Sequence, residues 1–271
     1  MKFYARSVAR IKDVLVTLEK FAPLPLQEDW DNAGLQIGLT ETDVSGVLLC
    51  LDVNEDIVRE AQREGCNLIV SHHPLLFRGV KCVSDADYVQ RTIRMCIKND
   101  ISVISMHTNM DNAHGGVNFR MAEKIELTAV KPLQAVCSDA SPVENGGGAI
   151  GILPHPMPTA EFLQMLKERF SIQALMTNRC NRKEVRTVAM CGGAGAFMLD
   201  EAIRQGADAF LTGEMHYHEY FGHEDEIQIA VMGHYESEQF TQEVFREILA
   251  VAYPQMKIVM AITCTNPIVV I

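Results

Sequence analysis

Residues 46–73, GVLLCLDVNEDIVREAQREGCNLIVSHH, contain the pattern that indicates the fold class most clearly. Its first part, GVLLCLDV, is a short continuous apolar run, which is typical of a strand buried on both faces. The segment NEDIVREAQREG has helical spacing and ends at Gly65, and NLIVSHH is a second short apolar run. A strand, a helix and a second strand in this order predict a βαβ unit with parallel strands.

The same alternation continues along the rest of the chain. We expect helices at residues 8–21, 88–100, 159–170, 196–206 and 237–253, and strands at residues 101–109, 185–193, 207–214, 227–235 and 256–263. Thr159 is a plausible N-cap for its helix. From Lys131 to Pro158 prolines and glycines are frequent, which indicates looped or antiparallel pieces at a domain crossing. The pattern is that of an α/β protein with largely parallel strands.

The chain also contains an internal repeat. Residues 187–214 (TVAMCGGAGAFMLDEAIRQGADAFLTGE) align without a gap with residues 46–73, at an offset of 187 − 46 = 141. The following strands end in similar pairs, His107 with Asp111 and His234 with Glu238, each spaced four apart. We infer two related α/β halves that present strand ends to a shared cleft, although two unrelated βαβ units would give the same order.

Composition narrows the class of protein. The net charge is −11, with 48% hydrophobic and 22% charged residues, as in a folded globular protein. An acidic surface disfavours nucleic acid and anionic membranes as partners. Charged residues interrupt the N-terminal apolar run, and no stretch approaches the roughly 20 apolar residues of a membrane span. From these two observations we expect a cytoplasmic protein. The eight cysteines have no C-x-x-C spacing and several lie in apolar runs, so we expect reduced thiols.

Candidate metal ligands follow the predicted strands. His72 and His73 can serve one site only where the strand has ended, and Pro74 forces that ending. A capped strand end with two partly solvated histidines is the alternative. Asp111 lies in a polar loop, where a plain turn residue is also common. His107 could be a ligand itself or could orient Asp111, and we favour the orienting role.

The second candidate pair lies at a strand-to-helix turn. His234 and Glu238 would share a helix face at i, i+4, and a Glu carboxylate has two oxygens that can bridge two metal ions. A first-turn acid stabilised by the helix dipole is the alternative for Glu238. Glu236 would face away. The CGGAGAF turn could offer N–H groups to a phosphate, but tight packing is favoured because it lacks the lysine of a P-loop.

The motifs around these residues resemble the type 2 GTP cyclohydrolase I homologues, also described as the NGG-interacting-factor-like family. They occur in order over nearly the whole chain: WDNAGLQIG (30–38), SHHPLLF (71–77), HTNMDNAHGGVN (107–118), CGGAG (191–195), LTGEMHYHE (211–219) and GHYESE (233–238). The resemblance implies metal ligands at His72, His73, Asp111, His234 and Glu238, with Glu238 bridging two ions. It also implies a first domain completed by the C-terminal segment and a toroidal homohexamer.

We therefore expect an α/β fold of two related domains: a metal-binding domain of residues 1–128 plus 230–271, and a second domain of residues 129–229. The expected cofactors are two divalent metal ions, with zinc, iron, manganese and nickel not distinguished. The expected activity is metal-dependent hydrolysis of a nucleotide-like or other small-molecule substrate, with Glu214 and His218 as candidates for proton transfer. The alternative is a non-enzymatic hexameric ring that acts as a metal-binding scaffold or regulatory partner.

Overall fold

The chain is divided into two units, each built around its own sheet. The computed structural model describes residues 8–136 and 144–271. The first unit takes the chain up to Met110 together with Thr241–Thr265, and the second takes Asp111–Phe240 together with Asn266–Ile271. The chain therefore passes from one unit to the other three times, after Met110, Phe240 and Thr265.

The first unit contains a five-stranded sheet in the order β1-β4-β3-β2-β13. Its strands are β1 (Gly34–Ile37), β2 (Val47–Cys50), β3 (Leu68–Ser71), β4 (Ser102–Ser105) and β13 (Ile258–Met260). β2, β3, β4 and β13 are parallel, and β1 is antiparallel to β4. The predicted parallel order is confirmed, and β13 from the C-terminal segment completes this sheet beside β2.

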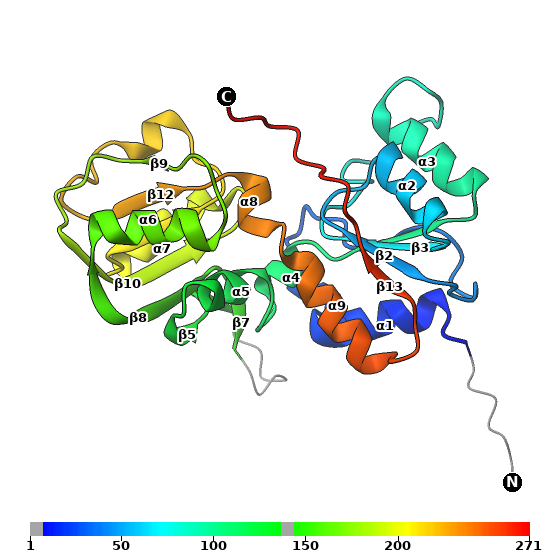
Figure 1. Ribbon diagram of the computed structural model, residues 1–271, viewed down its shortest axis with the longest axis horizontal. Coiled ribbons are helices and arrows are strands. Elements are labelled where there is room, and N and C mark those ends of the chain that lie inside the picture. The colour runs from blue at the N-terminus through cyan, green and yellow to red at the C-terminus, as the bar shows by residue number, and fades with distance from the viewer. Residues whose placement is uncertain (1–7, 137–143) are drawn as a thin grey trace, which may run out of the picture. The chain divides into compact units, whose positions relative to one another are not determined.

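Helices cover both faces of that sheet (Figure 1). The helices are α1 (Ile11–Phe21), η1 (Leu24–Leu26), α2 (Glu55–Arg63), α3 (Tyr88–Lys98) and α9 (Thr241–Ala252). α1 and α9 lie side by side on one face, and α2 and α3 lie on the other. Between α2, α3 and the sheet, Ile57 and Ile93 pack against Leu48, Ile69 and Val103, all of them buried. This apolar layer fixes the strands whose ends carry the candidate ligands.

The second unit contains a six-stranded sheet in the order β5-β8-β10-β11-β12-β9. Its strands are β5 (Thr128–Lys131), β8 (Ala149–Pro158), β9 (Met176–Thr177), β10 (Glu184–Cys191), β11 (Ala209–Thr212) and β12 (Gln228–Val231); β6 (Gln134–Val136) and β7 (Asn145–Gly147) form a separate pair. β10, β11 and β12 are parallel, and the other strands of this sheet run antiparallel to their neighbours.

The second unit also holds most of the short helices. They are α4 (Thr108–Asn112), which begins in the first unit, α5 (Val117–Lys124), α6 (Thr159–Arg169), η2 (Gly195–Met198), α7 (Leu199–Arg204), η3 (Tyr217–Tyr220) and α8 (His234–Glu238). The N-cap of α6 is Pro158 and not Thr159. Thr159 is the first residue of the helix, and its hydroxyl donates to the carbonyl of Arg182 at 2.7 Å. The capping prediction for Thr159 was therefore wrong.

The unit boundaries differ from the predicted domains, 1–128 plus 230–271 and 129–229. α5 contacts β8 and β10, and β5 pairs with β8, so residues 111–131 join the second sheet. β12 is hydrogen-bonded between β11 and β9, which brings α8 into the second unit as well. The antiparallel pieces expected between residues 131 and 158 are present, but the chain crosses between the units earlier, at Met110.

The internal repeat is visible in the strand registers. Val47 pairs with Leu68 and Val188 pairs with Ala209, so both pairs are separated by 188 − 47 = 209 − 68 = 141. The third strands differ, because Leu68 pairs with Ser102 and Ala209 pairs with Gln228, an offset of 228 − 102 = 126. The pair His107 and Asp111 and the pair His234 and Glu238 are both spaced four apart, but they do not occupy equivalent positions in the two units. By register, His107 corresponds to Gly233 and Asp111 corresponds to Ser237.

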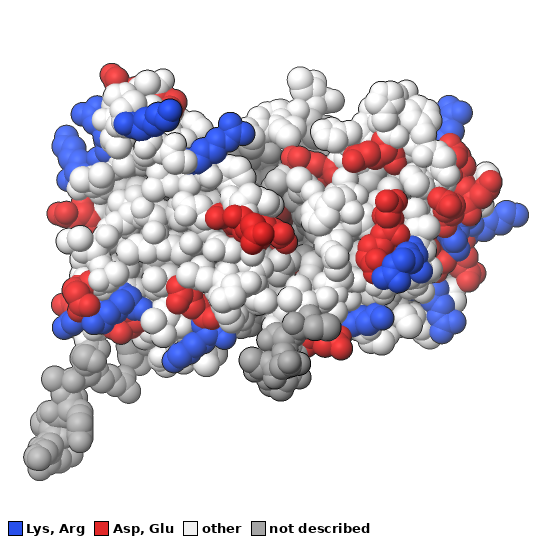
Figure 2. All heavy atoms as spheres, turned by 180° about the vertical axis from the view of Figure 1, so that it is seen from behind, with Lys and Arg blue, Asp and Glu red and all other residues white. Residues whose placement is uncertain are grey.

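The surface carries charged side chains of both signs. Acidic and basic side chains both occur on the face drawn in Figure 2, with uncharged surface between many of them. In the described part of the chain, no helix is both long and apolar enough to span a membrane.

Candidate metal centre

His72 and His73 follow β3 directly, at the carboxyl end of the strand. The backbone N–H groups of both residues donate to the carbonyl of Leu51, at 3.1 and 3.0 Å. This turn ends the strand before Pro74 and frees adjacent side chains from alternating between faces. The two ring centroids lie 4.8 Å apart, as expected if both rings serve one site.

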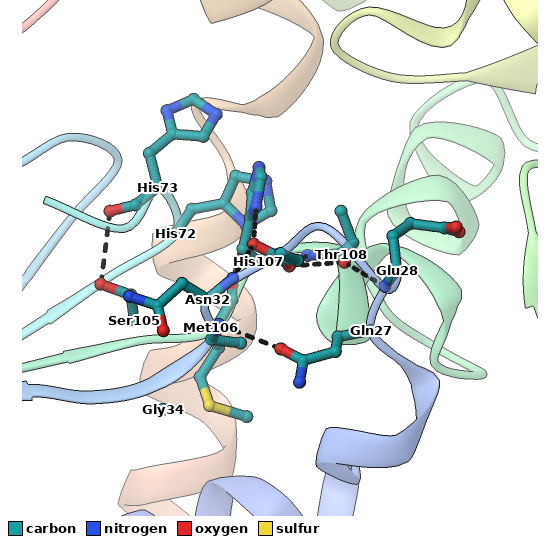
Figure 3. A network of polar contacts seen from close by, with 12 residues as sticks. Gln27, Glu28, Asn32, Gly34, His72, His73, Ser105, Met106, His107 and Thr108 are labelled. Carbon is teal, nitrogen blue, oxygen red and sulfur yellow. Dashed lines mark hydrogen bonds and ion pairs between the residues drawn. The ribbon is translucent and has the colours of Figure 1, made fainter. Parts of the chain in front are cut away.

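A third imidazole joins them from the end of β4. The ring centroid of His107 lies 5.2 Å from that of His72 and 5.4 Å from that of His73 (Figure 3). One ring nitrogen from each of the three residues lies within 4.8 Å of the others, so this group could hold a metal ion. The first unit therefore presents three imidazoles, one more than the ligand set expected from its part of the sequence.

Each of these rings has its Nδ1 held by an oxygen. Nδ1 of His72 faces the Met106 carbonyl at 2.9 Å, that of His73 faces Asp52 at 2.7 Å, and that of His107 faces Asp31 at 2.8 Å. These oxygens only accept, so each Nδ1 carries the hydrogen and donates. In the neutral ring the lone pair is then on Nε2, the form in which an imidazole binds a metal ion.

Asp31 connects the histidine cluster to α4. Its second carboxylate oxygen accepts from the backbone N–H and the hydroxyl of Thr108, at 3.0 and 2.5 Å. Burial raises the pKa of Asp31, but the hydrogen bonds from His107 and Thr108 outweigh it and lower the pKa to about 2. Asp31 is thus a charged group that orients His107 and satisfies the first turn of the helix carrying Asp111.

Asp52 has the same role behind His73. It follows β2, and its second oxygen accepts from the hydroxyl of Thr265 at 2.6 Å. Burial raises the pKa of Asp52, but the hydrogen bonds from His73 and Thr265 more than compensate, so the pKa is lowered overall. Sequence reasoning missed both aspartates. The strand-end rule could have found Asp52, whereas only the tertiary fold brings Asp31 to His107.

In the second unit, His234 and Glu238 share one face of α8. Nε2 of His234 lies 3.2 Å from a carboxylate oxygen of Glu238, the i, i+4 geometry expected from the sequence. Glu238 is buried, while Nδ1 of His234 contacts the carboxylate of Glu214 at 2.9 Å. Glu236 turns to a different partner, the side-chain amide of Asn266, at 2.8 Å.

Asp111 lies near Glu238 within this unit. It is in the short helix α4 and not in a loop, and its carboxylate and that of Glu238 offer oxygens within 4.8 Å of each other. Its carbonyl accepts from the side-chain amide of Asn118 at 3.1 Å, and the same side chain accepts from the N–H of Gly192 at 2.9 Å. The second unit therefore groups Asp111, His234 and Glu238, two carboxylates and an imidazole.

The glycine turn after β10 packs against this group. The N–H of Gly192 donates to Asn118 and that of Gly193 to the hydroxyl of Ser237 at 2.9 Å, so neither is directed to a phosphate. A Cβ added to Gly193 would lie 2.3 Å from Oε1 of Glu238. These contacts favour the tight-packing interpretation of the turn: a glycine is needed here because the carboxylate occupies the space.

The two residues expected to transfer protons have different surroundings. Glu214 holds Nδ1 of His234, the same relation that Asp52 has to His73. His218 is exposed in η3, where its ring contacts those of Tyr217 and Phe221. Proton transfer by Glu214 or His218 stays a prediction.

The amino-acid sequence of this chain is similar to those of known proteins. The family model described as Duf34/NIF3 (NGG1p interacting factor 3) matches residues 9–267. The chain belongs to the Duf34/NIF3 family. A "GTP cyclohydrolase 1 type 2 homolog" of Clostridium perfringens is 31% identical over 232 residues, which cover 84% of this chain and 87% of that protein. "NIF3-like protein 1" of Drosophila melanogaster is 30% identical over 247 residues, covering 89% and 82%.

Solved structures share the fold of this chain. A Bacillus cereus protein related to NIF3 aligns with a TM-score of 0.88 and 23% identity, covering 97% of this chain and 100% of that one. Staphylococcus aureus protein SA1388 aligns with a TM-score of 0.87 and 24% identity, covering 97% and 99%. The α/β fold of this chain is therefore also found in these two solved structures.

Proposed function

We propose that this Duf34/NIF3 chain is a metal-dependent hydrolase with two divalent metal ions in one site. The observation that carries the proposal is the set of three imidazoles in the first unit, each with Nδ1 bound to an oxygen. Three rings oriented in this way by two carboxylates and a carbonyl resemble the surroundings of metal-binding histidines in general. A histidine that only stabilises the fold does not need other imidazoles beside it.

Residues of both units would hold the ions: His72 and His73 from the first, and Asp111, His234 and Glu238 from the second, where the two carboxylate oxygens of Glu238 would serve both ions. Chain connectivity supports this assignment. The chain enters the second unit at Asp111 and leaves it two residues after Glu238, so both carboxylates lie next to a crossing point. The mixture of imidazole and carboxylate donors suits zinc, iron, manganese or nickel.

Bound metal ions would lower the pKa of a water molecule and polarise an electrophile in the substrate. The protein supplies the rest. Asp31, Asp52 and Glu214 keep His107, His73 and His234 in the tautomer that presents Nε2. His107 either binds a metal or orients its neighbours, and Glu214 and His218 are the candidates for moving the proton.

The proposed substrate is a nucleotide-like or other small molecule. The names of several relatives refer to GTP cyclohydrolase 1 type 2. Hydrolysis at the ring of a nucleotide is one reaction of the proposed kind. A toroidal homohexamer is part of the proposal, and light scattering of the purified protein tests it. A hexamer would be expected to place six such sites in one particle, and a monomer would contradict this part.

The experiment is elemental analysis of the purified protein, followed by substrate screening with the metal that is found. We expect two equivalents of metal per chain in the wild type and one or none in Glu238→Gln. Glu243→Gln, at an exposed position of α9, is the matched control and should retain both. Two equivalents in Glu238→Gln would contradict the bridging role, and metal without turnover of GTP or any screened substrate would favour a scaffold.

A further inference from the structure

Two exposed aromatic side chains flank the histidine cluster of the first unit. Trp30 is 59% exposed and Phe77 is 46% exposed, and their ring centroids lie 5.7 Å apart with an interplanar angle of 62°. Both are edge-on to His107, with centroid distances of 6.0 and 6.1 Å. Single exposed apolar residues are ordinary, but two aromatic rings beside one cluster of imidazoles form a distinct apolar surface.

The backbone around these rings is tied in place. The side-chain amide of Asn32 donates to the carbonyl of Leu76 at 2.8 Å, and the N–H of Leu76 donates to Gln36 at 3.2 Å. Gln36 in turn donates to the carbonyl of Asn32 at 2.6 Å. The segment that carries Trp30 is thus hydrogen-bonded to the segment that carries Phe77. The backbone that carries both rings is therefore fixed, while much of the surface of the rings stays in water.

We propose that Trp30 and Phe77 bind a planar aromatic ring of the substrate, of the nucleobase type, beside the histidine cluster. The inference rests on the proposed function, because it takes the histidines as the reacting end of the site. An aromatic side chain has only two rotatable bonds and therefore loses little conformational entropy on binding, and stacking on an indole face is favourable for any base. The planes of Trp30 and Phe77 are inclined by 62°, so a ring stacked on Trp30 would meet Phe77 close to the edge-to-face arrangement that aromatic pairs prefer.

The chain offers a direct probe, because Trp30 is its only tryptophan. We would titrate metal-free protein with guanosine 5′-monophosphate and adenosine 5′-monophosphate while following Trp30 fluorescence. Ribose 5-phosphate, which has the sugar and the phosphate without the base, is the comparison ligand. The nucleotides should change the emission saturably, and ribose 5-phosphate should not.

Substitution sharpens the result. Phe77→Leu should weaken nucleotide binding about fivefold, the size of an aromatic edge contact. Phe197→Leu, at an exposed phenylalanine of the second unit, is the matched control and should bind as the wild type does. No saturable change, an equal change with ribose 5-phosphate, or equal affinity in Phe77→Leu would overturn the proposal. Hydrolysis of a non-aromatic substrate by the metal-loaded protein would still support the proposed function.

A second inference comes from the third crossing of the chain. Thr265 and Asn266 are consecutive residues, the last of the first unit and the first of the C-terminal part of the second. Thr265 donates to Asp52, which holds His73, and Asn266 donates to Glu236, which lies between His234 and Glu238 in α8. The two neighbouring residues therefore contact different supports: Thr265 contacts Asp52 behind His73, and Asn266 contacts Glu236 in α8.

The segment before Thr265 is itself anchored. Glu60 of α2 is buried, and its two carboxylate oxygens accept from the backbone N–H groups of Ile262 and Thr263, at 2.8 and 3.0 Å. The N–H of Ala261 donates to the carbonyl of Leu49 in β2 at 2.8 Å. A buried carboxylate whose oxygens both accept from one short segment fixes that segment's path.

We infer that Thr265 and Asn266 are positioning residues for the metal ligands of the proposed site. Thr265 acts through Asp52 on His73, and Asn266 acts through Glu236 on α8. Thr265→Val keeps the side-chain shape and removes the hydroxyl, so it should lower metal affinity about fivefold, with Thr265→Ser restoring it. Asn266→Leu should lower it to a similar extent.

A double-mutant cycle separates positioning from general destabilisation. If Thr265 acts through Asp52, Thr265→Val should have no further effect on metal affinity in an Asp52→Asn background. Thr128→Val, which removes a hydroxyl bound to the Ile152 carbonyl in β8, is the matched control. Wild-type affinity in Thr265→Val, or additive effects in the cycle, would overturn this inference alone. A wild type that binds no metal would overturn the proposed function as well.

Discussion

Both units contain the same strand–helix–strand scaffold, but different residues lie at the ends of its strands. β2 pairs with β3 in the same register as β10 with β11, and the connection before the second strand turns at Gly65 and Gly206, with φ of 65° and 72°. The ends of the strands then differ. At the repeat offset of 141, His72 corresponds to Gly213 and His73 to Glu214, and Asp52 corresponds to Gly193.

The glycines of the second unit explain the difference. A Cβ at Gly213 would lie 2.6 Å from the carbonyl of Gly193 and 2.7 Å from the hydroxyl of Ser237. The strand ends of the second unit are therefore filled by α8, which carries His234 and Glu238, while those of the first unit carry the imidazoles themselves. The two units therefore share the register of their strand–helix–strand scaffold, but the candidate metal ligands follow the strand ends in the first unit and lie on a helix in the second.

The largest effect is expected at the glycine turn of the second unit. Gly193→Ala places a methyl group 2.3 Å from Oε1 of Glu238, and its φ of 56° is strained for alanine. We expect the carboxylate to be displaced and metal affinity to fall by about 100-fold, the upper range for such disturbances. Isothermal titration with zinc measures it.

Gly206→Ala is the matched control for this strain. Its φ of 72° is similarly unfavourable, but a Cβ there meets nothing within 4 Å. It should cost stability and leave metal affinity unchanged. Equal metal affinity in Gly193→Ala and wild type would contradict the account of α8 as the support of Glu238.

The next effect concerns the carboxylates behind the histidines of the first unit. Asp31→Asn should lower metal affinity about 10- to 100-fold, because the charge that orients His107 and the first turn of α4 is removed. Asp52→Asn should have a smaller effect, because the Asp52 side chain is 36% exposed and that of Asp31 is 0% exposed. Metal competition with a chromophoric chelator measures both. Asp85→Asn, at an exposed position, serves as control. A larger loss of metal affinity in Asp52→Asn than in Asp31→Asn would contradict these assigned roles.

Asp31 also predicts a pH dependence of folding. Its pKa is about 2 in the folded protein against 3.8 ordinarily, so its contribution to stability is fully present above pH 3.8. The contribution is up to about 2 kcal/mol and is lost as the pH falls through about 2. Urea unfolding of metal-free wild type and Asp31→Asn should show a stability difference at pH 6 that shrinks toward pH 2. A difference that stays constant over this range would contradict the charged state.

The smallest effect tests the equivalence of the two turns. Gly65→Ala and Gly206→Ala should each lower the free energy of unfolding by about 1 kcal/mol, because alanine is unfavourable at these positive φ values. Urea denaturation measures both. A large loss at one glycine only would show that the two turns are not equivalent.

Much of this arrangement could be predicted from local sequence. The apolar runs give the strands, Pro74 marks the end of the strand before it, and the spacing of His234 and Glu238 gives their common face. The register offset of the third strand could not be predicted, because the segments between the strands differ in length. The sequence comparison consequently matched His107 to His234, one residue away from the equivalent Gly233.

Long-range contacts account for what was missed. The five-residue helix α4 (TNMDN) is too short to be stable alone, and it forms where Asp31, 77 residues earlier in the chain, accepts from the N–H of Thr108. Sequence reasoning therefore placed Asp111 in a loop. The sequence places His107 after a strand, which leaves open whether it is a ligand or an orienting residue. Only the folded structure shows that its ring lies 5.2 Å from that of His72.

The most direct test of the central claim is anomalous diffraction from crystals of the metal-loaded protein, recorded at the absorption edge of the bound metal. The account predicts two anomalous peaks, with His72 and His73 of the first unit and Asp111, His234 and Glu238 of the second as ligands, and Glu238 between the peaks. A single peak, or peaks bound by residues of one unit only, would contradict it.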